Sequence, residues 1–107
     1  MRFRRSLESP AIQTVTTQKT AHAFASDRAG KMIFVPHVTP NAVLQFRLDP
    51  ETGKLSEAGQ AEGGAEKAGP RHIALHPTLP LAFTSNEVGN SVTSYAMDEN
   101  GLKPRET

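Results

Sequence analysis

The chain repeats itself at an interval of 49 residues. When residues 22–49 are aligned with residues 71–98 without a gap, five of the twenty-eight positions are identical. The identical positions in the first copy are Ala25, Phe34, Asn41, Val43 and Asp49. Similar residues fill many of the positions between them, so that apolar positions and turn positions stay in phase. A repeat of this length is typical of folds that are built from copies of one small structural unit.

Each copy contains four short apolar or alternating runs, which are separated by turn residues. The runs are residues 22–27, 31–38, 42–49 and 55–62 in the first copy and residues 71–77, 81–88, 91–98 and 102–107 in the second. Glycine, proline, asparagine and aspartate dominate the connections, and each of these residues favours turns. Four short strands in a unit of about fifty residues are the signature of a β-propeller blade. The sequence therefore predicts an all-β fold with about two four-stranded antiparallel blades.

These runs divide the chain into four predicted parts. Residues 1–20 form an N-terminal segment that is either part of a preceding blade or disordered, residues 21–60 form the first blade, residues 61–68 form a linker, and residues 69–107 form a second, incomplete blade. A propeller needs about four to eight blades to close its ring. Two blades leave strand edges and apolar faces in water. We therefore expect a fragment of a longer protein, or a unit that must assemble, that is inactive and poorly stable by itself.

Composition and missing motifs exclude several functional classes. The chain carries twelve basic and eleven acidic residues, a balance that predicts no nucleic-acid partner and no membrane partner. It has no cysteine, which excludes disulfides, zinc–thiolate sites and cysteine nucleophiles. The basic start is not followed by the apolar run of a secretory signal, which favours a cytoplasmic location. No phosphate loop, GxGxxG, GxSxG or HExxH motif is found, and we expect neither a cofactor nor a metal.

Four polar residues lie at places that the blade arrangement brings together. The first strand of a blade runs antiparallel to the second, so the beginning of the first lies beside the end of the second. His22 and Arg71 begin the first strands of the two blades, and His37 and Glu87 end the second strands. We therefore expect all four side chains on one rim of the central channel.

This set of residues has two interpretations. Arginine offers a charged fork that suits a carboxylate, a phosphate or a developing oxyanion, and glutamate and histidine can transfer protons. Arg71 and Glu87 could instead form only an ion pair at the junction of two blades, and such a pair stabilises little when it is exposed. His37 could equally be a hydrogen-bonding turn residue, and the case for His22 is weaker still. The residues alone leave both interpretations open.

The other polar residues have structural interpretations. His72 should point to the opposite side of its strand from Arg71 and be buried, because side chains alternate along a strand. His72 and His76 are four residues apart, a spacing that does not bring two side chains of one strand to the same metal ion. Asn41 and Asn90 occupy matching places and suit left-handed turn geometry.

Three motifs in order resemble the lactonase family of seven-bladed β-propellers. The segments VPHVTPNAVLQFRLDPETGKL and AGPRHIALHPTLPLAFTSNEVGNSVTSYAMDENG contain a PHxxPN motif, a GPRH motif and an NE pair, each at the expected place in its blade. The resemblance covers about residues 21–107. The family includes the propeller-type 6-phosphogluconolactonases and the fungal carboxy-cis,cis-muconate cyclases, and it implies a seven-bladed ring of which this chain holds two blades.

The resemblance also implies a reaction. It suggests metal-independent hydrolysis of a sugar-acid lactone such as 6-phosphogluconolactone, a step of the pentose phosphate pathway, with a lactone or an anionic sugar acid as the ligand. The alternatives are a carboxymuconate-type lactonising enzyme and a non-catalytic binding platform. By motif, His37, Arg71 and Glu87 match a histidine, an arginine and a glutamate of the site proposed for the cyclases. A second arginine would lie in a blade outside this chain. Arg71 and His22 are the predicted substrate-binding residues.

Overall fold

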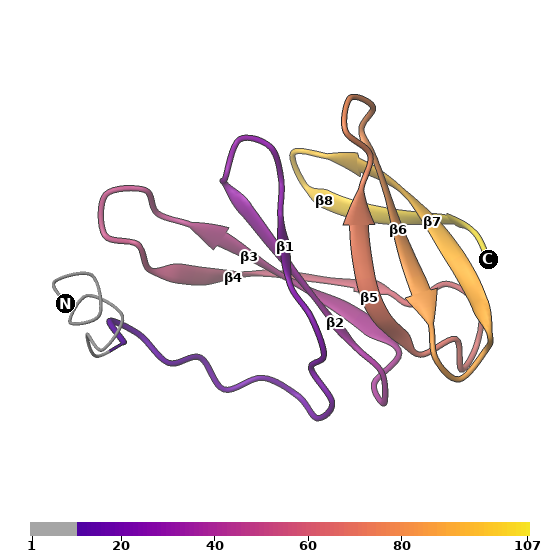
Figure 1. The fold of residues 1–107 in the computed structure, drawn as a ribbon. Coiled ribbons are helices and arrows are strands. Elements are labelled where there is room, and N and C mark those ends of the chain that lie inside the picture. The colour runs from indigo at the N-terminus through magenta and orange to yellow at the C-terminus, as the bar shows by residue number, and fades with distance from the viewer. Residues whose placement is uncertain (1–10) are drawn as a thin grey trace, which may run out of the picture.

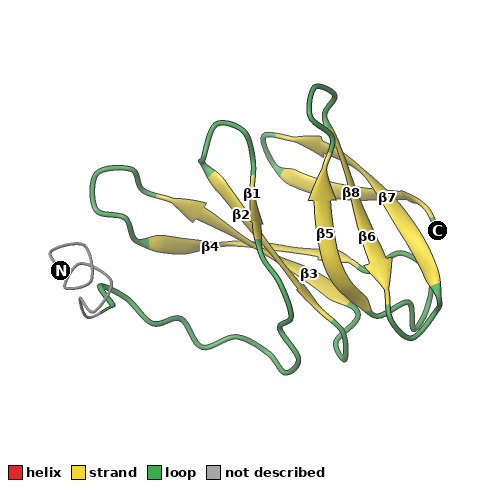
Figure 2. Ribbon diagram, in the orientation of Figure 1, coloured by secondary structure: helices red, strands yellow, loops and turns green. Residues whose placement is uncertain are grey.

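The computed structural model describes residues 11–107, which form two four-stranded antiparallel sheets that lie one against the other (Figures 1 and 2). The first sheet consists, in order, of β1 (Ala25–Ser26), β2 (Met32–His37), β3 (Ala42–Leu48) and β4 (Leu55–Glu62). The second consists of β5 (Pro70–Leu75), β6 (Leu81–Asn86), β7 (Ser91–Asp98) and β8 (Gly101–Glu106). The predicted all-β fold with two blade-like sheets is confirmed. Residues 11–107 contain no helix that is long and apolar enough to cross a membrane.

The repeat extends to the backbone conformation. Asn41 and Asn90 have φ angles of 56° and 49°, which confirms the left-handed geometry expected of both. Thr20 and Gly69, which are also 49 residues apart, have φ angles of 62° and 72°. The carbonyl oxygens of Thr20 and Gly69 accept hydrogen bonds from the residues that follow β2 and β6, at 3.2 and 2.8 Å. The two sheets are therefore copies of one unit in detail.

The boundaries differ from the predicted ones in three places. The strand expected over residues 22–27 is reduced to the two residues of β1, because one extra residue shifts the register between an isolated bridge at Ala21 and the pairs of β1. The second blade was predicted to be incomplete, but β8 pairs with β7 over most of its length after a two-residue turn at Glu99 and Asn100. The predicted linker 61–68 becomes residues 63–69, because β4 continues to Glu62.

The predicted N-terminal segment is described only in its second half, and residues 1–10 lie outside the described residues. Residues 11–18 run beside the first sheet (Figure 1). The side-chain amide of Gln13 donates to the Leu55 carbonyl at 3.1 Å and accepts from the Leu55 N–H at 2.7 Å. Gln18 donates to Gln60 at 3.2 Å. The segment is thus held on the first sheet by side-chain hydrogen bonds.

The core lies between the two sheets. Its buried apolar residues are Met32, Phe34, Val43 and Ala61 from the first sheet and Ala82, Tyr95 and Leu102 from the second. Polar side chains also cross this interface. The Tyr95 hydroxyl donates to the Glu62 carbonyl at 2.8 Å, and the Gln45 side chain accepts from the Leu102 N–H at 2.7 Å. Packing of one blade on the next therefore forms the hydrophobic core of the described residues.

The Tyr95 side chain makes stability sensitive to alkaline pH. Burial raises the pKa of Tyr95 to about 12, against an ordinary value of 10.0. A group whose pKa is higher in the folded state contributes stability that is fully present below pH 10 and is lost as pH rises toward 12. We expect the free energy of unfolding to fall by about 2–3 kcal/mol across this interval.

Tyr95 is the only tyrosine of the chain, and there is no tryptophan, so its ionisation can be followed directly by phenolate absorbance. The measurement is urea unfolding at a series of pH values from neutral to 12, beside the absorbance titration. Tyr95→Phe is the control and should lose this part of the pH dependence. A tyrosine that titrates at its ordinary pKa in the folded chain would contradict the burial described here.

Candidate active site

Three of the predicted site residues meet at the junction of the two sheets. Arg71 Nε donates a hydrogen bond to His22 Nε2 at 2.9 Å, and Arg71 Nη1 forms an ion pair with Glu87 Oε1 at 2.9 Å. His22 Nε2 can accept this bond only in the tautomer that carries its proton on Nδ1. His22 precedes the first sheet, whereas Arg71 lies in β5 of the second sheet and Glu87 directly follows β6. We call these three residues the rim cluster.

A β-bulge places Arg71 in the rim cluster. Pro70 pairs with Asn86 and His72 pairs with Ser85, so Arg71 is an extra residue without a partner on β6. A bulge of this kind redirects a side chain out of the regular alternation of the strand. The same one-residue shift occurs in the first sheet, between the Ala21 bridge and β1. His22 therefore lies beside its own irregularity, 49 residues before Arg71.

The bulge also explains why the prediction for His72 was wrong. His72 was expected to be buried on the opposite side of the strand from Arg71, but it is exposed. Its ring meets the ring of His22 edge to face, with 4.8 Å between the ring centroids. The alternation of side chains, on which the prediction rested, does not hold across a bulge. His72 is thus a neighbour of the rim cluster that sequence reasoning missed.

His37 is not part of the rim cluster. It is fully buried, its Nδ1 lies 2.9 Å from the Val35 carbonyl, and its Nε2 lies 3.0 Å from the Thr17 hydroxyl. The 49-residue repeat contains the reason, because it aligns His37 with the buried Asn86 and not with Glu87. Glu87 comes one residue later and faces solvent. The catalytic role of His37 remains a prediction.

Asn41 fixes the linker that leads to Arg71. Its side-chain oxygen accepts from the Gly69 N–H at 2.9 Å, and its side-chain nitrogen donates to the Ala65 carbonyl at 3.1 Å. Its backbone carbonyl accepts from the Gly63 N–H at 2.8 Å. One residue therefore binds the linker at three points just before β5 begins. The sequence indicated only a turn here, although recurrence of asparagine after 49 residues was a signal that both positions have a shared role.

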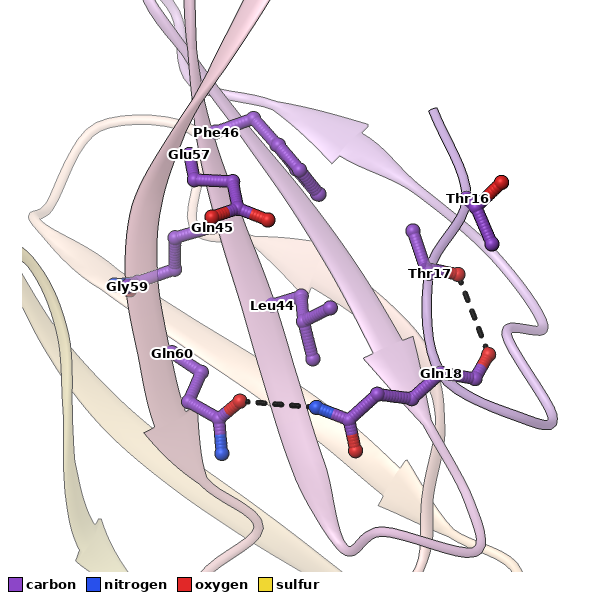
Figure 3. A pocket seen from close by; sticks show the side chains of 9 residues that line it. All are labelled: Thr16, Thr17, Gln18, Leu44, Gln45, Phe46, Glu57, Gly59 and Gln60. Atoms are coloured by element: carbon purple, nitrogen blue, oxygen red, sulfur yellow. Dashed lines mark hydrogen bonds between the residues drawn. The ribbon is translucent and has the colours of Figure 1, made fainter. Parts of the chain in front are cut away.

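A groove lies between residues 16–18 and strands β3 and β4 of the first sheet (Figure 3). Its volume is about 370 Å³, and it is lined by residues 16–18 and by side chains of β3 and β4, among them Leu44, Phe46 and Glu57. Gln18 and Gln60 bridge it with a hydrogen bond. It contains no arginine and no histidine. Its lining offers no counterpart of the rim cluster, so we do not regard it as the reaction site.

The rim cluster can bind an anion and hold a base beside it. The side chains of Arg71 and Glu87 are 43% and 47% exposed, so the ion pair is open to solvent and adds about 0–1 kcal/mol to stability. Within residues 11–107, two of the five guanidinium N–H donors are engaged by side chains, which leaves the other three to a ligand. Among residues 11–107, no three histidine, aspartate or glutamate side chains lie close enough together to hold a metal ion.

Two packed four-stranded antiparallel sheets, with a polar cluster where their innermost strands meet, define a pair of β-propeller blades. Residues 6–107 match the family described as "Lactonase, 7-bladed beta-propeller". The chain belongs to this family of seven-bladed lactonase propellers.

The chain is similar to part of several longer proteins. It is 34% identical over 91 residues to the 6-phosphogluconolactonase of Yersinia enterocolitica and 32% identical over 98 residues to that of Erwinia tasmaniensis. The alignments cover 84% and 91% of this chain but only 27% and 29% of those proteins. The chain thus spans between a quarter and a third of the length of the relatives that it matches.

Solved structures share the fold of the chain. A 6-phosphogluconolactonase candidate from Bacteroides uniformis superimposes with a TM-score of 0.75 at 21% identity, covering 87% of this chain and 28% of that one. The periplasmic gluconolactonase of Pseudomonas aeruginosa superimposes with a TM-score of 0.69 at 21% identity, covering 80% of this chain and 24% of that one. At such identities the likeness concerns the fold alone.

Proposed function

We propose that this chain supplies part of the active site of a lactonase that hydrolyses a sugar-acid lactone, such as 6-phosphogluconolactone. The observation that carries the proposal is the rim cluster, in which Arg71 is held between His22 and Glu87 at 2.9 Å on both sides. Membership of the lactonase family and relatives named 6-phosphogluconolactonase support it.

Arg71 is the hydrogen-bond donor that stabilises negative charge in this proposal. Its free N–H donors bind the anionic group of the substrate or polarise the lactone carbonyl, where negative charge develops when water attacks. His22 accepts from Nε and Glu87 accepts from Nη1, so the guanidinium is fixed before the substrate arrives. Fixed donors of this kind stabilise a transition state better than mobile ones, because they need no reorganisation during the reaction.

Glu87 has the role of the general base. Only its Oε1 is engaged by Arg71, and the side chain is half exposed, so the other oxygen can accept a proton from the attacking water. His37 could donate a proton to the leaving alcohol only if the segment that carries Thr17 withdrew from it, because its ring is covered in this structure.

A cytoplasmic location also remains a prediction, since one protein of the same fold, from Pseudomonas aeruginosa, is periplasmic.

The test is a complete propeller that contains this chain. We would replace the aligned 91 residues of the Yersinia enterocolitica 6-phosphogluconolactonase with the matching residues of this chain and measure hydrolysis of 6-phosphogluconolactone. A folded chimera should hydrolyse the lactone well above the spontaneous rate. A chimera with the circular dichroism and melting transition of the parent enzyme, but without hydrolysis of this or related lactones, would remove the proposal. The 107-residue chain alone should be inactive, because it lacks the remaining blades.

A further inference from the structure

A cavity of about 480 Å³ lies beside the rim cluster, and we call it the linker pocket. The turn after β2, the linker between the sheets and the turn after β6 line it with Val38, Thr39, Asn41, Glu66, Lys67 and Val88. Val88 directly follows Glu87 of the rim cluster. The Glu87 N–H donates to the Gly69 carbonyl at 2.8 Å, and the Gly89 N–H donates to the Ala68 carbonyl at 2.9 Å. The linker therefore runs directly beside the turn that carries Glu87.

The repeat places the linker pocket on the same rim as Arg71. Val38 lies 49 residues before Glu87, so it holds in the first unit the place that Glu87 holds in the second. Lys67 lies four residues before Arg71, and four residues span at most about 14 Å even when the chain is fully extended. A sugar-sized ligand that contacts Arg71 can therefore extend its far end toward the Lys67 side chain.

Lys67 has an unusual backbone conformation. Its φ angle is 56°, and it is the third residue of a turn in which the Ala68 N–H donates to the Ala65 carbonyl at 3.1 Å. Glycine or asparagine is favoured where this position of a turn has a positive φ angle, because larger side chains are strained there. Strained residues of this kind gather at binding sites. A lysine at this place therefore indicates a role for its ammonium group.

The charges of the linker pocket suit a ligand with two kinds of polar group. Glu66 and Lys67 are both exposed, and neither forms an ion pair within residues 11–107. The lysine ammonium has three N–H donors for an anion, whereas an ionised carboxylate only accepts hydrogen bonds and suits hydroxyl groups. Val38 and Val88 add apolar walls. The combination fits a hydroxylated carbon chain that ends in an anionic group.

We infer that the linker pocket binds the remote phosphate of a phosphorylated sugar-acid lactone, and that Lys67 is the residue that selects for this phosphate. The inference rests on the proposed function and deepens it. The proposed function leaves two roles open for Arg71, which are binding of the anionic group and polarisation of the lactone carbonyl. With the phosphate on Lys67, Arg71 acts on the carbonyl.

The test compares two lactones that differ in the phosphate, 6-phosphogluconolactone and glucono-1,5-lactone, as substrates of the chimeric lactonase. Lys67→Asn removes the ammonium group and introduces a residue that tolerates the positive φ angle. The ratio of kcat/KM for the phosphorylated lactone to kcat/KM for the other should fall about tenfold or more, because a charged hydrogen bond to the phosphate is lost. An unchanged ratio would overturn the inference and leave the proposed function standing.

Lys54→Asn is the matched control. It removes the same charge from an exposed lysine at the other end of β4, away from the linker. The ratio of the two kcat/KM values should stay as it is in the parent chimera. The Lys67→Asn variant should melt at or above the temperature of the parent, since asparagine relieves backbone strain. A lower melting temperature would show that Lys67 has a structural role instead.

A binding measurement tests the linker pocket without turnover. Isothermal titration calorimetry of the folded chimera with 6-phosphogluconate should show binding that Lys67→Asn weakens about tenfold, with gluconate as the comparison ligand. An inactive chimera would count against the proposed function, but this titration would still decide about the linker pocket. Absence of 6-phosphogluconate binding, or binding of equal strength with and without Lys67, would overturn the inference.

Discussion

Replacement of Tyr95 by alanine is expected to remove most of the stability of this chain. The side chain is fully buried between the two sheets, and its hydroxyl donates across the interface to the Glu62 carbonyl. Loss of a buried aromatic ring costs about 3–5 kcal/mol, which approaches the whole stability of a small domain. We expect the thermal unfolding transition followed by circular dichroism to become broad and to shift to much lower temperature.

Two milder substitutions serve as comparisons for the stability loss of Tyr95→Ala. Tyr95→Phe keeps the ring and removes only the hydroxyl, so it should cost about 1–3 kcal/mol, the penalty for leaving the Glu62 carbonyl without its partner. Ser94→Ala alters the neighbouring residue on the opposite face and should change stability by less than about 0.5 kcal/mol. A Tyr95→Ala chain that melts within a few degrees of the parent would show that the interface between the sheets is not the core.

Arg71→Ala is expected to lower kcat/KM of the chimeric lactonase by about 100- to 1,000-fold, the usual loss when one donor to a developing oxyanion is removed. Arg71→Lys should also be impaired, because a single ammonium group cannot present the planar fork that contacts His22 and Glu87 together. Glu87→Gln should reduce the rate by about 100-fold or more if the carboxylate is the general base. The measurement is initial-rate hydrolysis of 6-phosphogluconolactone.

Measuring the stability of each variant distinguishes a loss of catalysis from a loss of folded protein. The Arg71–Glu87 pair is half exposed, so its removal should cost less than about 1 kcal/mol. Lys103→Ala is the matched control, since it breaks the ion pair between Lys103 and Asp98, 3.6 Å apart, away from the rim cluster. That variant should keep full activity. Arg71→Ala and Glu87→Gln variants that also keep full activity would remove both catalytic roles.

Much of the fold could be predicted from the sequence because the 49-residue repeat shows which strands and turns correspond in the two sheets. A register of 49 residues aligned the strands of two sheets, and the asparagines at positions 41 and 90 marked matching left-handed turns. The rim cluster followed from the antiparallel order of the first two strands, and His22, Arg71 and Glu87 do meet. These inferences depend only on the period of the chain and on the direction of its strands.

The errors arose where an offset of one residue decides which way a side chain points. The bulge at Arg71 changes the side on which His72 lies, and strand alternation cannot reveal a bulge beforehand. His37 was grouped with Glu87 although the repeat aligns it with Asn86, so it falls one position short of the rim. A shift of one residue moves a side chain to the other face of a sheet, which is why small offsets decided the composition of the site.

The hydrogen bond between His22 and Arg71 joins the segment that leads into the first sheet to the first strand of the second. A small rotation of one blade against the next would stretch this bond before it disturbed the apolar contacts behind it. The ring of His22 is consequently a reporter of blade alignment, and its tautomer is visible by nitrogen NMR. Because Arg71 is oriented by a contact between two blades, a propeller with misaligned blades would contain every reactive side chain and still lack their working geometry. Activity would therefore depend on the packing of blades within one polypeptide, as the activity of some oligomers depends on the interface between subunits.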